Sequence, residues 1–272
     1  MFYTGGVKSW IAGVGASCLL ALCASCSSGT STATEPASQA LAENGTDVAD
    51  IASRIASMTA SFASTTESTR LKLSTVRATA GPLYAPSGCL VASHSSADPS
   101  QLDLAFTQCD GPWGLSGLAG TLGVVESQSP DLVFDAKGLV VNLATVNFDA
   151  TAHIDFEGAD RTMTWIGTLS GTTARGRAFN TSANLTLSWQ LGGTCITAFG
   201  TTTGEVAGSA VSSSMRNLFR CDSACPVTGS ISVWATQSST PTDSLALIFN
   251  GMDAAYFDVA GGRDSIQLSC GF

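Results

Sequence analysis

The 272-residue sequence predicts a mainly β fold, an antiparallel sheet with one N-terminal amphipathic helix. From about residue 70 onward, apolar residues alternate with polar ones, and Gly, Asn, Asp and Ser separate the alternating runs. This is the pattern of half-buried strands joined by short turns. No strand–helix–strand rhythm accompanies it, which favours antiparallel over parallel pairing. A curved sheet, a sandwich and a partial barrel are all compatible with the pattern.

The helix is expected over residues 46–64. Its apolar residues recur at spacings of three and four, which places them on one face: Val48, Ile51, Ile55, Met58 and Phe62. Thr46 or Asp47 can cap the first turn, where a carboxylate also suits the positive end of the helix. We expect this apolar stripe to pack on the domain; a partner helix in a coiled coil is the alternative.

The clearest strand is expected over residues 146–157. Its apolar residues, such as Val146 and Phe148, fall on one face, and its polar residues, such as Asn147 and Asp149, fall on the other. A strand of this length favours a large, curved sheet. Further strands are expected near residues 102–106, 118–124, 132–134, 163–169, 185–191, 194–200, 204–211, 227–236, 244–250 and 264–270.

The first 25 residues have the parts of an export signal. Lys8 precedes an apolar stretch that runs from Trp10 to Leu22. A membrane-spanning helix needs about 20 apolar residues, so this shorter stretch is expected to be removed with the signal. Two small residues then precede Cys26, after which the composition changes to Ser, Thr and Gly.

This junction resembles the lipobox of bacterial lipoproteins, in which an aliphatic residue and two small residues precede the modified cysteine. Cys23 stands here in place of the aliphatic residue. The resemblance implies that Cys26 is the first residue of the mature protein and carries a diacylglycerol and an N-acyl chain such as palmitate, enough for stable anchoring. Ser27, where Asp would favour inner-membrane retention, implies the outer membrane of the bacterial cell envelope. An ordinary secretory signal cut near Ala24 is the alternative.

These observations divide the chain into three parts: a signal peptide over 1–25, a flexible Ser/Thr-rich tether over 26–42, and a single helix-plus-antiparallel-β domain over 43–272. Membrane lipid, reached through the N-terminal acyl chains, is the partner that the resemblance implies. Acidic residues outnumber basic ones by 21 to 12, and the formal net charge is −9. A nucleic-acid partner is therefore not expected, because such proteins carry a basic patch.

Six cysteines follow Cys26, and an even number in an exported chain predicts disulfide bonds: Cys89, Cys109, Cys195, Cys221, Cys225 and Cys270. We expect Cys89 to pair with Cys109 at the base of one hairpin, and the other four to pair among themselves. Three residues separate Cys221 from Cys225, whereas redox motifs and zinc ribbons have two. This spacing favours structural disulfides.

Two groups of residues are candidate ligand sites. His153, Asp155 and Glu157 share one strand face, and two of them could share a metal ion; a solvated polar face is the alternative. Trp113 lies in an expected turn, and Trp234 lies on the polar side of an expected strand. Both are candidate exposed platforms on which a sugar ring could stack.

The sequence predicts no enzyme and no cofactor. It contains no Gly-x-Ser-x-Gly motif and only two histidines, so it gives no sign of a serine-hydrolase triad. We expect a lipid-anchored envelope protein whose disulfide-stabilised β domain has a structural or binding role, with a glycan or an envelope protein as partner. A carbohydrate-binding module that uses Trp113 and Trp234 is the alternative.

Overall fold

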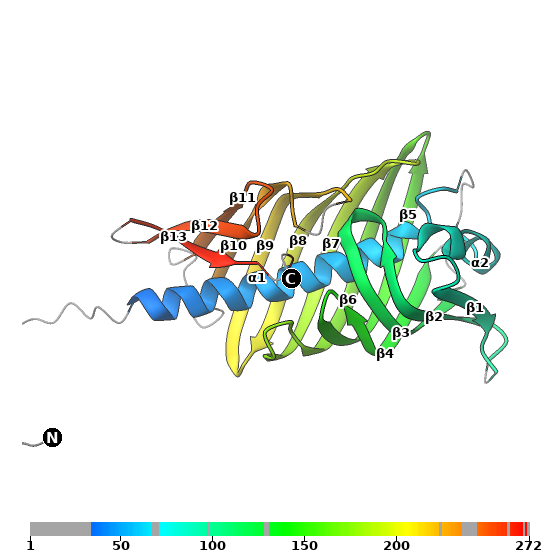
Figure 1. The fold of residues 1–272 in the computed structure, drawn as a ribbon, viewed down its shortest axis with the longest axis horizontal. Coiled ribbons are helices and arrows are strands. Elements are labelled where there is room, and N and C mark those ends of the chain that lie inside the picture. Colours follow the sequence, from blue (N-terminus) through cyan, green and yellow to red (C-terminus); the bar gives the residue numbers. More distant parts are fainter. Residues whose placement is uncertain are drawn as a thin grey trace, which may run out of the picture. The chain divides into compact units, whose positions relative to one another are not determined.

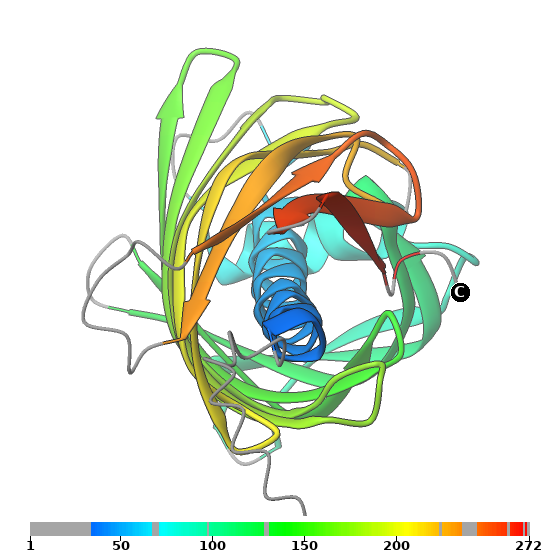
Figure 2. The same cartoon turned by 90° about the vertical axis from the view of Figure 1, so that its left-hand side faces the viewer.

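The computed structural model describes residues 34–66, 71–96, 98–127, 131–222, 225–235, 244–259, 262–268 and 270. The expected signal peptide, Cys26 and the first part of the expected tether lie outside these residues. The described residues belong to one unit, Ala33–Phe272. In this unit a single antiparallel sheet of 13 strands curves around helix α1 (Figures 1 and 2).

The strands pair in sequence order, from the edge strand β1 to the edge strand β13. Their bounds are β1 Leu90–His94, β2 Gln101–Gly111, β3 Leu115–Glu126, β4 Leu132–Val141, β5 Ala144–Glu157, β6 Asp160–Thr172, β7 Ala178–Gln190, β8 Ile196–Val206, β9 Ser209–Arg220, β10 Thr228–Ala235, β11 Leu245–Phe249, β12 Ala254–Val259 and β13 Gly262–Gln267. The mainly β, antiparallel prediction is confirmed. Of the architectures that the sequence left open, the structure has one open, curved sheet.

The described helices are α1 Thr34–Ser61, α2 Leu73–Ala80 and the 3-10 turns η1 Gly81–Leu83 and η2 Pro112–Gly114. Helix α1 begins earlier than expected, so residues 34–42 are helical and do not belong to the tether predicted over 26–42. None of the helices described is both long and apolar enough to cross a membrane.

From residue 44 onward helix α1 is buried on every side, which the prediction of an amphipathic helix missed. Every residue from 44 to 64 is buried, and Figure 2 shows the helix inside the curve of the sheet. Its apparent polar face consists partly of short hydroxyl side chains that donate back to helix carbonyls: Ser53 at 2.9 Å, Thr59 at 2.8 Å and Ser61 at 2.7 Å. Hydroxyls satisfied in this way can be buried at little cost.

The long strands alternate as expected. On β5, residues 144–152 are alternately buried and exposed, so that Val146 and Phe148 face α1 while Asn147 and Asp149 face away from it. We call the face that points toward α1 the inner face and the opposite one the outer face. The hydrophobic core therefore lies between the inner face and the helix, and the outer face is polar.

Three disulfides confirm the pairing expected for the six cysteines. Cys89–Cys109 joins the residue before β1 to β2, which is the base of the first hairpin. Cys195–Cys221 joins the residue before β8 to the residue after β9, and Cys225–Cys270 joins the segment before β10 to the one after β13. Each bond can stabilise the fold by about 2–4 kcal/mol, chiefly by restricting the unfolded chain.

Gly45 marks a close approach between α1 and β10. A Cβ atom at Gly45 would lie 2.1 Å from Cγ1 of Val233, and Val233 is fully buried and β-branched, so it has little freedom to turn away. We expect Gly45→Ala to lower the free energy of unfolding by about 1–3 kcal/mol, although alanine has the higher helix propensity.

Gly81→Ala is the matched control. Gly81 has helical dihedrals, φ −55 and ψ −51, and no atom lies within 4 Å of a Cβ added there. The free energy of unfolding of Gly81→Ala should therefore equal that of the wild-type protein or be slightly higher. Urea unfolding with the disulfides intact measures the free energy of unfolding of both variants. An equal change in the two variants would contradict the close packing of α1 against β10.

Candidate binding site on the outer face

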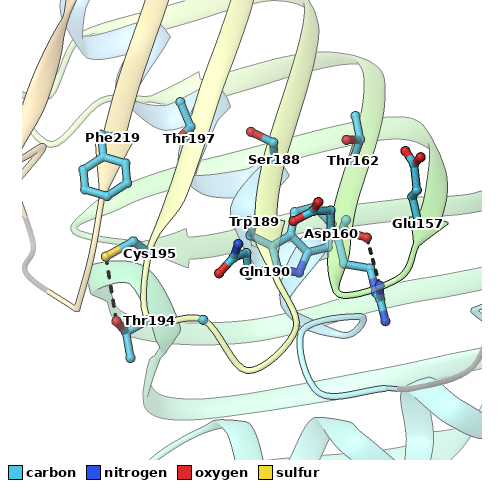
Figure 3. A pocket seen from close by; sticks show the side chains of 12 residues that line it. Glu157, Asp160, Thr162, Ser188, Trp189, Gln190, Thr194, Cys195, Thr197 and Phe219 are labelled. Carbon is cyan, nitrogen blue, oxygen red and sulfur yellow. Dashed lines mark hydrogen bonds between the residues drawn. The ribbon is translucent and has the colours of Figure 1, made fainter.

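A hollow of about 690 Å³ opens on the outer face, where strands β6 to β9 end (Figure 3). Four of its residues form one row across four neighbouring strands, because Thr162 pairs with Ser188, Ser188 with Thr197, and Thr197 with Phe219. At about 4.8 Å between strands, this row spans roughly 15 Å. We call Thr162, Ser188 and Thr197 the hydroxyl row, and Phe219 lies at its end on β9.

One rim of the hollow carries acidic and amide side chains. Glu157 pairs with Asp160, and Asp160 pairs with Gln190, all three exposed at the ends of β5, β6 and β7. The turn between β7 and β8 follows Gln190 and contributes Thr194 and Cys195 to the lining of the hollow (Figure 3). The Cys195–Cys221 disulfide fixes this side.

Arg161 and Trp189 also line the hollow, but both are inner-face residues and are buried. The Arg161 guanidinium donates to the carbonyls of Gly158, Asp160 and Thr66 at 2.6, 2.9 and 3.1 Å. These three carbonyl acceptors stabilise the buried positive charge of Arg161. Within the described structure, Nε of Arg161 and Nε1 of Trp189 are buried without an acceptor, so the floor of the hollow is short of hydrogen-bond acceptors.

Trp113 is not the exposed platform that the sequence predicted. It is 1% exposed, its Nε1 donates to the Gly193 carbonyl at 3.2 Å, and its ring lies 5.9 Å from that of Trp189. The backbone of η2 turns it inward with a positive φ of 59. Trp234 is half-buried and pairs with Ser212, near the opposite end of β9 from Phe219. The two tryptophans therefore form no joint site.

The structure brings two of the three predicted metal ligands, His153 and Asp155, into contact. His153 Nδ1 lies 2.6 Å from an Asp131 oxygen and Nε2 lies 3.3 Å from Asp155, while Glu157 belongs to the rim of the hollow. The Asp131 hydrogen bond raises the pKa of His153 above its usual value. Among the described residues, no group of three His, Cys, Asp or Glu side chains is placed to hold a metal ion. The arrangement is that of a polar outer face.

A second polar cluster lies inside the sheet and was not predicted. Asp50 of α1 accepts from Arg54 Nε at 2.7 Å and also from Arg220 of β9. Burial raises the pKa of Asp50, but Arg220 and Arg54 lower it by more, so the net pKa lies below its usual value. This cluster joins the helix to the sheet and faces away from the hollow.

Two neighbouring ion pairs link α1 to the β6–β7 turn. Arg175 Nε lies 3.1 and 3.2 Å from the two carboxylate oxygens of Asp47, and Arg177 contacts Glu43. The sequence offered no signal for these pairs, because their members lie more than a hundred residues apart.

No protein-family model matches the chain, and no curated protein or solved structure is significantly similar to it. The function is therefore argued from the residues of this chain.

Proposed function

We propose that the protein is a lipid-anchored lipoprotein of the bacterial cell envelope, held in the outer membrane by acyl chains on Cys26, and that its β unit has a non-enzymatic structural or binding role. The main support for this proposal comes from the disulfide bonds. All six cysteines that follow Cys26 are paired, and such bonds persist in oxidising compartments outside the cytoplasm. The export signal and the lipobox-like junction ending at Cys26 agree with that location.

The start of α1 supports a short connection to the membrane. Cys26 and Thr34 are eight residues apart in the sequence, so a fully extended chain limits their Cα atoms to a separation of about 30 Å. The β unit would then work close to the lipid surface. The outer face presents hydroxyl, amide and carboxylate groups that bind partners by hydrogen bonding rather than by covalent chemistry.

Labelling of growing bacteria with radioactive palmitate tests the anchor. We expect label in the wild-type protein and in Cys23→Ser, and none in Cys26→Ser, because the thioether and the N-acyl chain both require Cys26 as the first mature residue. Cys23→Ser is the matched control, since it changes the neighbouring cysteine. Label that survives in Cys26→Ser, or that is absent from the wild-type protein, would refute the proposal.

A further inference from the structure

The hollow on the outer face has the size of a ligand site. Its volume, about 690 Å³, lies within the range of roughly 300–1,000 Å³ typical of small-molecule sites. It opens to solvent along the ends of the strands (Figure 3). A ligand longer than the hollow could therefore place a few units inside and let the remainder run out along the surface.

Thr162, Ser188, Thr197 and Gln190 give the hollow four neutral hydrogen-bonding groups. The hydroxyls of Thr162, Ser188 and Thr197 lie next to one another on three neighbouring strands, and the Gln190 amide lies in the next row. A hydroxyl both donates and accepts, and an amide offers two donors and a carbonyl. These groups match a ligand that itself carries many hydroxyls.

The charges around the hollow disfavour an anion. Glu157 and Asp160 lie on the rim, while the only cation in the lining, Arg161, is buried and donates to three backbone carbonyls. An acidic ligand would meet two carboxylates without an available positive charge. The chain as a whole is also acidic, with a net charge of −9.

Phe219 supplies an apolar surface at the end of the hydroxyl row. It is half-buried on the outer face of β9, and its ring borders the hollow in Figure 3. Aromatic faces pack well against the apolar faces of sugar rings. Thr197 and Phe219 each lie two residues from a half of the Cys195–Cys221 disulfide, so the site is held in place before a ligand arrives, which reduces the ordering cost of binding.

From these four observations we infer that the hollow binds a neutral oligosaccharide, with Phe219 as the stacking ring and Thr162, Ser188, Thr197 and Gln190 as hydrogen-bonding groups. The inference rests on the binding role proposed above but not on acylation of Cys26. The Cys26→Ser protein should therefore bind as well as the wild-type protein, and the failure of one proposal can be distinguished from the failure of the other.

Calorimetric titration of the purified full-length protein tests the inference. The panel contains gluco-, galacto-, manno-, xylo- and N-acetylglucosamine oligosaccharides, together with acidic uronate and cationic glucosamine oligosaccharides of the same length. We expect binding of at least one neutral series, and affinities at least tenfold weaker for the acidic series. Phe219→Ala should lower the affinity for the neutral oligosaccharide at least tenfold.

Phe199→Ala is the matched control. Phe199 is 37% exposed on the same face of β8, two residues from Thr197, but does not line the hollow. This variant should bind as tightly as the wild-type protein, and circular dichroism should show that both variants are folded. The inference is overturned if no neutral oligosaccharide binds, if an acidic or cationic series binds more tightly than every neutral one, or if the two phenylalanine variants lose affinity equally.

Discussion

Asp50→Asn should lower the free energy of unfolding by about 3–5 kcal/mol, because removal of one partner leaves buried charge uncompensated. Asp50 is the carboxylate that both Arg54 and Arg220 contact, and the two arginines are 2% and 1% exposed. Asparagine keeps the shape of the side chain but not its charge. Two neighbouring guanidiniums would then lie in the core without the carboxylate between them, and each would repel the other.

The exposed pair between Asp258 and Arg263 provides a matched control. Its atoms lie 3.2 Å apart, but the side chains are 74% and 63% exposed. Asp258→Asn makes the same chemical change where water screens both charges, so its stability should be the same as that of the wild-type protein within measurement error. Equal losses in Asp50→Asn and Asp258→Asn, measured by urea unfolding, would contradict a buried ionic cluster.

A second substitution separates charge from packing. In the double variant Asp50→Asn/Arg220→Met, one of the two unbalanced charges is replaced by an apolar side chain of similar length. Stability should recover in part relative to Asp50→Asn alone, since well-packed apolar residues can replace buried ionic groups without loss. A further loss in the double variant would show that Arg220 contributes mainly through its other contacts.

The sequence predicts the strands of this fold much better than it predicts their ends. The period of two is a geometric property of an extended chain, and the alternation over 146–157 therefore corresponds to the long strand β5. The strand expected over 204–211 was wrong, because Ala207 and Gly208, with φ values of 51 and 78, form the turn between β8 and β9. A positive φ at alanine is uncommon, so Gly208 is the residue of this pair whose type indicates a turn, and one glycine within an alternating run does not distinguish a turn from a strand.

The burial of α1 could not be predicted from its own sequence. Asp50, Ser53 and Arg54 give the helix a polar side, which in most helices faces water. Here their partners are the helix itself and Arg220, 170 residues from Asp50. Periodicity reports which residues share a face, but not whether a distant strand supplies the opposite charge.

The hollow could not be predicted for a similar reason, because it depends on how strands distant in the sequence pair. Phe219 lies on the outer face, but it reaches the hydroxyl row only because the β8–β9 pairing shifts between Ala198 and Gly200. The predicted platform residue Trp113 turns inward instead, because η2 has a left-handed backbone at that position. The alternation of apolar and polar residues could have indicated that Phe219 is exposed. Its place beside the hydroxyl row could be predicted only from the register of four strands.

Asp47→Asn should remove a pH dependence of stability of about 3 kcal/mol in total, of which about 2 kcal/mol falls between pH 4 and pH 6. Burial raises the pKa of Asp47 from 3.8 to about 6, although Arg175 partly opposes this shift and Asp50 adds to it. Between these values the folded state binds a proton that the unfolded state has released. Stability from this group is therefore present below about pH 4 and is lost as the pH rises toward 6. A shift of about two units corresponds to about 3 kcal/mol.

The measurement is the difference in unfolding free energy between Asp47→Asn and the wild-type protein as a function of pH. Asp50, whose lowered pKa gives the opposite slope, is present in both proteins, as are Glu43, Arg175 and Arg177. Their contributions therefore largely cancel in the difference. The variant should gain about 2 kcal/mol relative to the wild-type protein from pH 4 to pH 6, whatever the constant offset caused by the changed contact with Arg175. A difference that stays flat, or that falls with pH, would mean that Asp47 is ionised across this range and that Arg175 outweighs the cost of burying it.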